Sequence, residues 1–399
     1  MAVFIFSGAS GAHPEAWPSL LGQFSNAQED QGVVINLSTS AGGAIAALAQ
    51  LALAQEMGKG DVVVWDHAPA LNACLETCDY DPLEALRAVE FFLRACVRRK
   101  VPVVPLVSDR LVDARMEEPG EIAARLWHLF DRFALTPIST ATVLRRAAAA
   151  GKLLPMHFIG DGDIYKPGEP VNRLLARNLA TVIDQARDNN AVPLPPEHSI
   201  YERTAGWLRL AVAANAEIEQ GATVSRKAVG LITTEIVELA PGGRVRFETS
   251  GEVVGLAPIL SDDGGLLRVT VEDERYRMLS RAPFSTVIAP LPEGVSVPSV
   301  GQISFAHHIG RKIVLSKPTG LVLHNVSHLV REGEIRTDLG AVPPPEPNAK
   351  AIVRVLALIE RRPVTKTPKD LAAEAETETG AETGAEAVTN EKRPETAIG

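Results

Sequence analysis

The chain is 399 residues long, carries a formal net charge of −9 and is 46% hydrophobic. This length accommodates two domains of the usual ~100–200 residues, and the apolar content can form a sizeable core. The acidic balance argues against a general nucleic-acid-binding protein, which needs a basic surface to face the phosphates.

The three cysteines, Cys74, Cys78 and Cys96, lack the pattern of a disulfide framework or a metal site. Cys74 and Cys78 are four residues apart, but no second pair with metal-ligand spacing accompanies them. Free thiols of this kind are typical of a reducing compartment. The first apolar run is too short for the core of a signal peptide, and no stretch approaches membrane-spanning length. We therefore expect a cytoplasmic protein that is not inserted in a membrane.

The first half of the chain alternates apolar runs with amphipathic segments. Strands are predicted at 3–6, 32–37, 61–65 and 101–107. Helices are predicted at 12–24, 44–57, 82–99, 119–133, 139–150 and 170–187. This alternation is typical of βαβ units, whose parallel sheet is covered by helices on both faces.

The pattern changes at about residue 189. Residues 189–196 are rich in proline and asparagine, which is typical of a linker, and a helix is predicted at 201–220. From 224 to 339, short β-branched runs alternate with turn residues, a spacing that predicts a β-sandwich. A further helix is predicted at 350–361, and the segment after it is too poor in apolar residues to become ordered. The predicted parts are an α/β domain at 1–190, a linker and connecting helix at 191–222, a β-sandwich-like domain at 223–345, and a short helix with a disordered acidic tail at 346–399.

Small and polar residues follow the first three predicted strands. These residues are Gly8-Ala9-Ser10 after the first strand, Gly42-Gly43 after the second, and Asp66-His67 with Asn72 after the third. A fourth polar segment, 161–166, precedes the helix at 170–187. Because the carboxyl ends of parallel strands meet at one edge of the sheet, we expect these loops to line one crevice.

This order of loops resembles the SGNH, or GDSL-like, hydrolase family over about residues 1–187. The resemblance implies a flavodoxin-like three-layer α/β fold and a serine esterase that needs no cofactor. It also implies that Ser10 is the nucleophile and that Ser10, Gly43 and Asn72 form the oxyanion hole. The continuation from Lys166 into the following helix resembles the family's late segment, which aligns Asp163 and Lys166 with the aspartate and histidine of its Asp-x-x-His motif.

Three departures from the family pattern concern the catalytic groups. Ala9 stands where the family has an aspartate, and Asn72 is further from its strand than the usual motif places it. The late segment contains no histidine, so the usual base is absent, and a positioned base contributes typically ~10²–10⁴-fold to the rate. The residues that could replace it are Lys166 in a Ser-Lys arrangement, His13 three residues after Ser10, and His67 at the neighbouring strand end.

Other patterns give no cofactor or metal site. The loop from Gly8 to Gly11 lacks the third glycine of a dinucleotide-binding fingerprint. His307 and His308 are adjacent, and on a strand their side chains would point to opposite faces of the sheet. We therefore predict neither a nicotinamide cofactor nor a bound metal.

Two main functions are compatible with these residues. The first is hydrolysis of an O-acylated carbohydrate or another small ester, with the β-rich domain helping to position the substrate. The alternative is a non-catalytic relative, in which the crevice and the β-rich domain bind a glycan or a protein partner. A third hypothesis is an assembly role for the β-rich domain, as a homo-oligomer or with a partner protein.

Overall fold

A five-stranded parallel sheet forms the centre of the first half of the chain. The computed structural model describes residues 1–8, 16–26, 32–38, 45–69, 71, 75, 81–107, 121–152, 159–160, 163–201, 206–229, 232–261, 263–272, 274–279, 300–329, 335–337, 340–343 and 345–363. The predicted disordered tail therefore lies outside the described residues, apart from its first part.

The strand order of this sheet is β2-β1-β3-β4-β5, with all neighbours parallel. The strands are β1 (Ala2–Ser7), β2 (Val33–Asn36), β3 (Val62–Asp66), β4 (Val103–Val107) and β5 (Ile138–Ser139). Residues 3–7 of β1 and all of β3 and β4 are buried, which explains their continuous valine- and isoleucine-rich runs. The order 2-1-3-4-5 is that of flavodoxin-like folds, as predicted.

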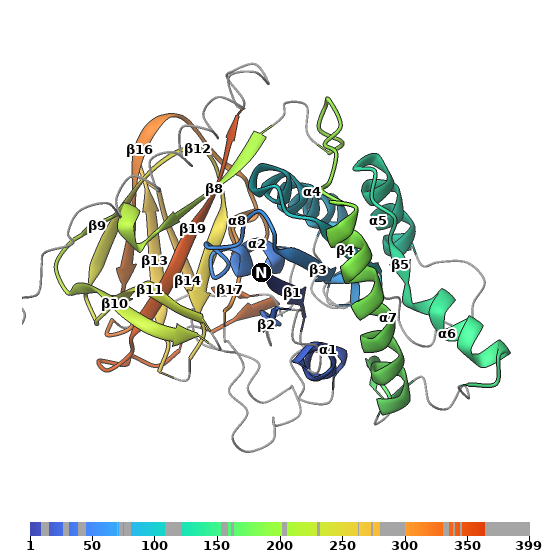
Figure 1. The fold of residues 1–399 in the computed structure, drawn as a ribbon. Coiled ribbons are helices and arrows are strands. Elements are labelled where there is room, and N and C mark those ends of the chain that lie inside the picture. The colour runs from blue at the N-terminus through green and yellow to red at the C-terminus, as the bar shows by residue number, and fades with distance from the viewer. Residues whose placement is uncertain are drawn as a thin grey trace, which may run out of the picture. The chain divides into compact units, whose positions relative to one another are not determined.

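Helices cover both faces of the sheet, which gives three layers (Figure 1). The helices are α1 (Trp17–Asn26), α2 (Ala46–Leu51), α4 (Pro82–Arg99), α5 (Glu121–Arg132), α6 (Thr140–Ala149) and α7 (Glu169–Asp188). Helices α2, α4 and α5 share a core cluster with Phe6 and Trp65, whereas α1, α6 and α7 pack with Ile5 and Val64. Alternate residues of each strand therefore serve opposite helix layers.

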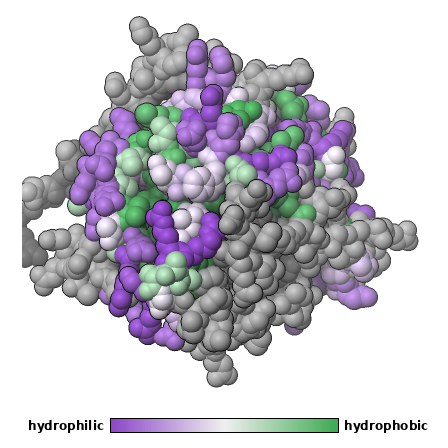
Figure 2. Space-filling model, turned by 90° about the vertical axis from the view of Figure 1, so that its right-hand side faces the viewer, coloured by the Kyte–Doolittle hydropathy of each residue, from purple (hydrophilic) through white to green (hydrophobic). Residues whose placement is uncertain are grey.

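Figure 2 shows the side of the molecule that lies to the right in Figure 1, where hydrophilic side chains are mixed with small hydrophobic areas. Helix α7 has the amphipathic pattern expected beside a sheet, with Val171 and Leu175 buried and Arg173 and Arg177 exposed. In the part of the chain that the structure describes, no helix has the length and apolar content needed to cross a membrane.

The second half forms an antiparallel sheet that the described residues build from ten strands. Its main path is β10-β11-β19-β12-β16-β13-β14, with β8, β9 and β15 paired at its sides. The strands are β8 (Gly206–Val212), β9 (Ala216–Ile218), β10 (Ala222–Val229), β11 (Ile232–Leu239), β12 (Arg244–Ile259), β13 (Leu266–Val271), β14 (Glu274–Leu279), β15 (Ile303–Ser304), β16 (Ile313–Asn325) and β19 (Val353–Pro363). Small hairpins β6 (Ile159–Gly160) with β7 (Asp163–Pro167) and β17 (Ile335–Thr337) with β18 (Gly340–Val342), and the short helix α8 (Phe305–Ile309), complete the described elements.

The predicted β-sandwich is not confirmed, because strand pairing joins these strands into one curled sheet. The cause is β12, which is 16 residues long and is hydrogen-bonded on both sides. Val245 pairs with β9 and β16, whereas Val253 pairs with β16 and β19. Register shifts along β12 mark β-bulges, which bend a strand and increase its twist.

Two helices predicted from the sequence are wrong. The segment 201–220 contains β8, a 3₁₀ turn at Ala213–Asn215 and β9, and the segment 350–361 belongs largely to β19. Strands β8 and β19 pair with each other from Gly206–Pro363 to Val212–Ala357. The alanine and leucine content of both segments favours a helix locally, but pairing between distant segments outweighs that propensity.

The two halves share a hydrophobic core. Helices α2 and α4 contact β8, β12 and β19, and one core cluster contains Phe92 of α4 together with Leu356 and Ile359 of β19. Residues Met1–Pro363 form one compact unit. The face of the α/β layer that carries α2 and α4 is therefore covered by the β-rich half.

Candidate functional site

The crevice predicted from the sequence lies at the carboxyl ends of β1, β2 and β3. The structure describes the last residues of these strands, including Ser7, Leu37 and Asp66. The proposed nucleophile and oxyanion residues, Ser10, Gly43 and Asn72, and the alternative base His13 lie outside the described residues. The strand ends that lead to them belong to the described part.

Asp163 and Lys166 lie on β7, immediately before α7. Their backbone belongs to a two-stranded hairpin with β6, in which Gly160 pairs with Asp163, while their side chains are outside the described part. The sequence predicted no strand here. Pro167 ends the hairpin, and Gly168 alone separates it from the first turn of α7.

Hydrogen bonds connect the start of α7 with the carboxyl end of β3. Asn172 Oδ1 accepts from the backbone N–H of Trp17 at 3.1 Å. The Trp17 indole Nε1–H in turn donates to Asp66 Oδ2 at 3.1 Å. All three side chains are buried, and Asp66 is the last residue of β3. The late segment thus enters α7 close to the sheet edge where the predicted crevice lies.

His67 is the one proposed catalytic side chain that the structure describes. It is 2% exposed, follows β3 directly, and has its ring centroid 6.0 Å from that of Trp65. Its Nε2 lies 2.7 Å from Gln50 Oε1. Burial lowers the pKa of His67 from 6.5 to about 3, so the imidazole is neutral at physiological pH.

The partners of Gln50 determine which nitrogen of His67 carries the proton. The Gln50 amide Nε2 donates to Ser7 O at 2.9 Å and to Leu37 O at 2.8 Å. Both amide hydrogens are therefore used, and Oε1, which only accepts, faces His67. His67 must then donate from Nε2–H, which leaves Nδ1 as its unprotonated nitrogen.

Buried polar atoms without a hydrogen-bond partner gather at this edge. Among the described residues, Ser7 Oγ, Trp65 Nε1 and His67 Nδ1 are buried and have no such partner. An unpaired buried polar group is costly, and in a native protein it calls for a bound water, a ligand or a catalytic role. Ser7 ends β1, Trp65 lies near the end of the neighbouring strand β3, and His67 follows β3 directly, so the three atoms lie at the sheet edge that the loop order predicts as the crevice.

The β-rich half contacts Ile45, the first described residue after Gly43. The backbone N–H of Ile45, two residues after Gly43, donates to Gln302 Oε1 at 3.0 Å, and this contact is buried. Gly255 lies so close to Ile45 that a Cβ atom there would stand 2.6 Å from Ile45 Cδ1. The same Cβ atom would stand 2.2 Å from the backbone carbonyl oxygen of Ile303, which cannot move aside as a side-chain end can, so only glycine fits where β12 pairs with β15.

An ion-pair cluster joins the two halves beside this contact. Arg87 of α4 is 3% exposed and pairs with Glu84 at 2.7 Å and with Glu252 of β12. Arg361 of β19 lies 3.5 Å from the same Glu252 carboxylate. Both arginines stack over the ring of Phe91, at 5.1 and 5.8 Å from its centroid. The cluster holds α4 against β12 and β19.

The described residues offer no group of three His, Cys, Asp or Glu side chains placed to bind a metal. His307 and His308 belong to the short helix α8 and not to a strand, so opposite strand faces do not separate them. His308 Nδ1 lies 2.9 Å from Ser304 O, and the two imidazole rings contact each other edge to face. These contacts give the pair a local structural role.

Comparisons with known proteins bear on the fold. No protein-family model matches the chain, and no curated protein sequence matches it either. The crystal structure of a two-domain esterase (CEX) active on acetylated mannans is similar, with a TM-score of 0.54 and 10% identity over 91% of each chain. The same esterase co-crystallised with mannopentaose gives a TM-score of 0.53 and 9% identity over 92% of each chain. At this identity the likeness concerns the fold alone, which the two chains share over nine-tenths of their length.

Proposed function

We propose that the protein is an SGNH-like serine esterase that removes acyl groups from an O-acylated carbohydrate or a similar small ester. The observation that carries the proposal is the fold shared across nine-tenths of both chains with an esterase active on acetylated mannans. Because a fold alone does not specify a reaction, the proposal also relies on the loop order that puts Ser10 after β1.

In the proposed reaction, the Ser10 hydroxyl oxygen attacks the ester carbonyl carbon and its proton passes to a base. Backbone N–H groups of Ser10 and Gly43, with the Asn72 amide, would stabilise the negatively charged carbonyl oxygen. The bond between the acyl carbon and the ester oxygen of the sugar then breaks, and the protonated base gives its proton to that oxygen, which leaves as the sugar alcohol. Water hydrolyses the acyl-serine by the same steps and releases the carboxylic acid.

Lys166 is the base that we favour over His67. The Nε2–H of His67 is engaged with Gln50 Oε1, so only Nδ1 is free to accept a proton. A pKa of about 3 makes that nitrogen a weak base at neutral pH. A lysine can act as a base where its surroundings lower its pKa, as in Ser-Lys hydrolases.

The β-rich half would support the proposed oxyanion hole through a contact that lies outside the crevice. Gln302 accepts from the N–H of Ile45, at the end of the loop that carries Gly43. A shift of that contact would move the proposed oxyanion hole. We therefore expect the β-rich half to be needed for activity as well as for substrate binding.

The second candidate is a non-catalytic protein that binds a glycan or a protein partner through the crevice. It is favoured by one specific observation, namely that the described imidazole at the strand ends is buried, neutral and engaged with Gln50. The late segment also lacks the histidine of the family motif. In this case the crevice would bind an acetylated mannan fragment without releasing acetate.

The test compares hydrolysis of p-nitrophenyl acetate and labelling by a fluorophosphonate in the wild type, Ser10→Ala and Ser199→Ala. Ser199 is a matched control, because its hydroxyl is buried and unpaired among the described residues but lies in the linker. We expect Ser10→Ala to lose the label and to lower turnover by several orders of magnitude, with Ser199→Ala unchanged. Equal turnover in all three proteins would eliminate Ser10 as the nucleophile, and binding without turnover would favour the second candidate.

A further inference from the structure

We propose that Gln50 is a positioning residue, whose buried amide holds the carboxyl ends of β2, β1 and β3 in one fixed arrangement. The catalytic consequence rests on the proposed function, because Ser10 lies three residues beyond Ser7 and Gly43 six residues beyond Leu37. The structural part of the proposal stands on the described contacts alone.

The side chain of Gln50 bridges three strand ends at once. It donates to Ser7 O at the end of β1 at 2.9 Å and to Leu37 O just after β2 at 2.8 Å. It accepts from His67 Nε2–H just after β3 at 2.7 Å. Since β2, β1 and β3 are neighbours in the sheet, one amide connects three consecutive strands.

These carbonyl groups need a donor because the strand ladder stops beside them. The ladder between β1 and β2 ends with the bond from Leu37 N–H to Ile5 O at 2.9 Å. Ser7 and Leu37 are both buried, so water does not replace the missing strand partner. A primary amide carries two N–H donors at a fixed angle, which suits two neighbouring carbonyl oxygens.

We call these three hydrogen bonds of the Gln50 side chain the clamp, and the third of them makes the clamp specific for glutamine. Once both N–H groups of Gln50 are used, its Oε1 requires a donor, and His67 Nε2–H supplies it. Neither Glu nor Met offers this combination of two donors and one acceptor.

Gln50 is itself held rigidly. All six residues of α2 are buried, and Gln50 is 0% exposed. The N-terminal end of α2 is fixed by the bond from Ile45 N–H to Gln302 Oε1. The position of the amide is therefore set by packing, which is what a residue that orients a reactive loop requires.

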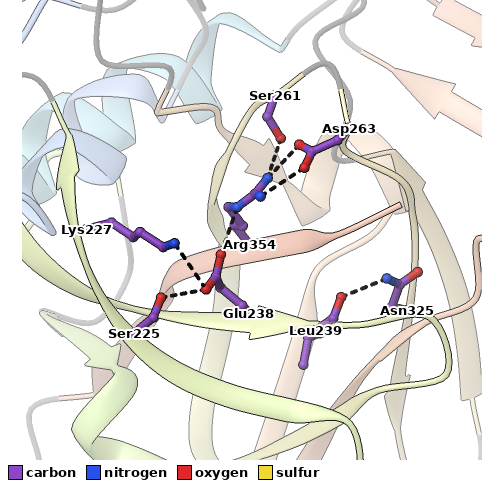
Figure 3. Close-up of polar contacts among 8 residues, drawn as sticks. All are labelled: Ser225, Lys227, Glu238, Leu239, Ser261, Asp263, Asn325 and Arg354. Carbon is purple, nitrogen blue, oxygen red and sulfur yellow. Dashed lines mark hydrogen bonds and ion pairs between the residues drawn. The ribbon is translucent and has the colours of Figure 1, made fainter. Parts of the chain in front are cut away.

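The test uses Gln50→Met, which keeps the length of the side chain and removes its polar atoms. Asn325→Leu is the matched control, because Asn325 of β16 is also 0% exposed and its amide also donates to two backbone carbonyls. Those carbonyls are Leu239 O at 2.8 Å, drawn in Figure 3, and Ala351 O at 2.9 Å. Both variants therefore lose the same kind of interaction, but only one loses it at the proposed crevice.

Three quantities are measured on the full chain: backbone hydrogen–deuterium exchange, the fluorophosphonate labelling rate, and kcat with KM for p-nitrophenyl acetate. We expect Gln50→Met to speed exchange at the ends of β1, β2 and β3, and Asn325→Leu to leave exchange there unchanged. We expect labelling and kcat to fall by ~10²-fold in Gln50→Met, with little change in KM, because misplaced catalytic groups lower the rate of the chemical step. Unchanged exchange at the three strand ends, or an equal loss of labelling in both variants, would overturn the proposal.

The exchange measurement separates failure of this inference from failure of the proposed function. If the wild type is neither labelled nor active, the esterase proposal fails, and faster exchange in Gln50→Met still supports the clamp. If Gln50→Met does not fold, Gln50→Glu replaces it. The carboxylate has no donor for Ser7 O and Leu37 O, and protonation restores one donor. Exchange at these strand ends should then approach that of the wild type on acidification, and a pH-independent difference would contradict the clamp.

Discussion

The His67 imidazole should remain neutral far below the pH at which histidine normally takes up a proton. His67 is 2% exposed, and burial lowers its pKa from 6.5 to about 3 in the folded protein. The unfolded chain therefore binds more protons than the folded one between about pH 3 and 6.5. Stability from this group is fully present above pH 6.5 and is lost as the pH falls through that window.

The size of the effect follows from the width of the window. Each pH unit within it is worth ~1.4 kcal/mol for one proton. From pH 8 to pH 5 the free energy of unfolding should fall by about 2 kcal/mol on account of His67 alone. If the buried site opens locally, the imidazole takes up a proton at a higher pH, and the free energy of unfolding then falls by less.

The assay is urea unfolding of the wild type and His67→Leu at several pH values between 8 and 5. The variant leaves Gln50 Oε1 without its donor at every pH, so it should be less stable than the wild type at pH 8. The difference should shrink by about 2 kcal/mol at pH 5, because the variant has no proton to bind at this position. In parallel, ¹⁵N NMR should show His67 protonated at Nε2 and not at Nδ1 at pH 5. A His67 signal that titrates near pH 6.5, or parallel stability curves for the two proteins, would refute the reasoning.

Two predictions concern charged contacts of the β-rich half. Arg87→Leu should lower the free energy of unfolding by about 3 kcal/mol, because it removes one partner of the buried Glu252. As a control, Arg125→Leu, which breaks an exposed pair on α5, should lower it by less than ~0.5 kcal/mol. Equal losses in urea unfolding would contradict the buried-pair account. Hydrogen bonds from Arg354 hold the pKa of Asp263 at about 2, so this contact should stabilise the fold above pH 4 and lose its effect as the pH falls toward 2 (Figure 3). Asp263 is half exposed, so Asp263→Asn should cost roughly 0.5–1 kcal/mol at pH 7 and progressively less as the pH falls through 2, and a pH-independent cost would argue against the ion pair.

The parallel sheet could be predicted from the sequence because its signals are local. The runs of β1 and β3 are apolar on both faces, and helices alternate with the strands along the chain. Strands β8 and β19 could not be predicted in the same way. Their pairing joins residues near 209 to residues near 360, and neither segment carries a local pattern that reveals its partner. The continuous sheet in place of a sandwich has the same origin, because it depends on the bends of β12.

In the candidate site, too, features with a local sequence signal could be predicted and features that depend on distant contacts could not. The edge of the sheet was predictable, since polar and small residues follow β1, β2 and β3 in order. Gln50 was not, because it lies in an alanine- and leucine-rich helix where a single glutamine gives no signal. Its importance depends on three contacts with residues 43, 13 and 17 positions away in the chain. Likewise, nothing local to His67 predicts that its Nε2–H is already engaged.

The central claim is that Ser10 forms a covalent acyl intermediate, and trapping that intermediate tests it most directly. The protein is mixed with p-nitrophenyl acetate, quenched in acid within the burst phase, digested and examined by mass spectrometry. The proposed mechanism predicts an acetyl group on the peptide that contains Ser10, absent from Ser10→Ala and present in Ser199→Ala. Ester hydrolysis that persists in Ser10→Ala, or an acetyl group on another residue that turns over at the catalytic rate, would contradict the account.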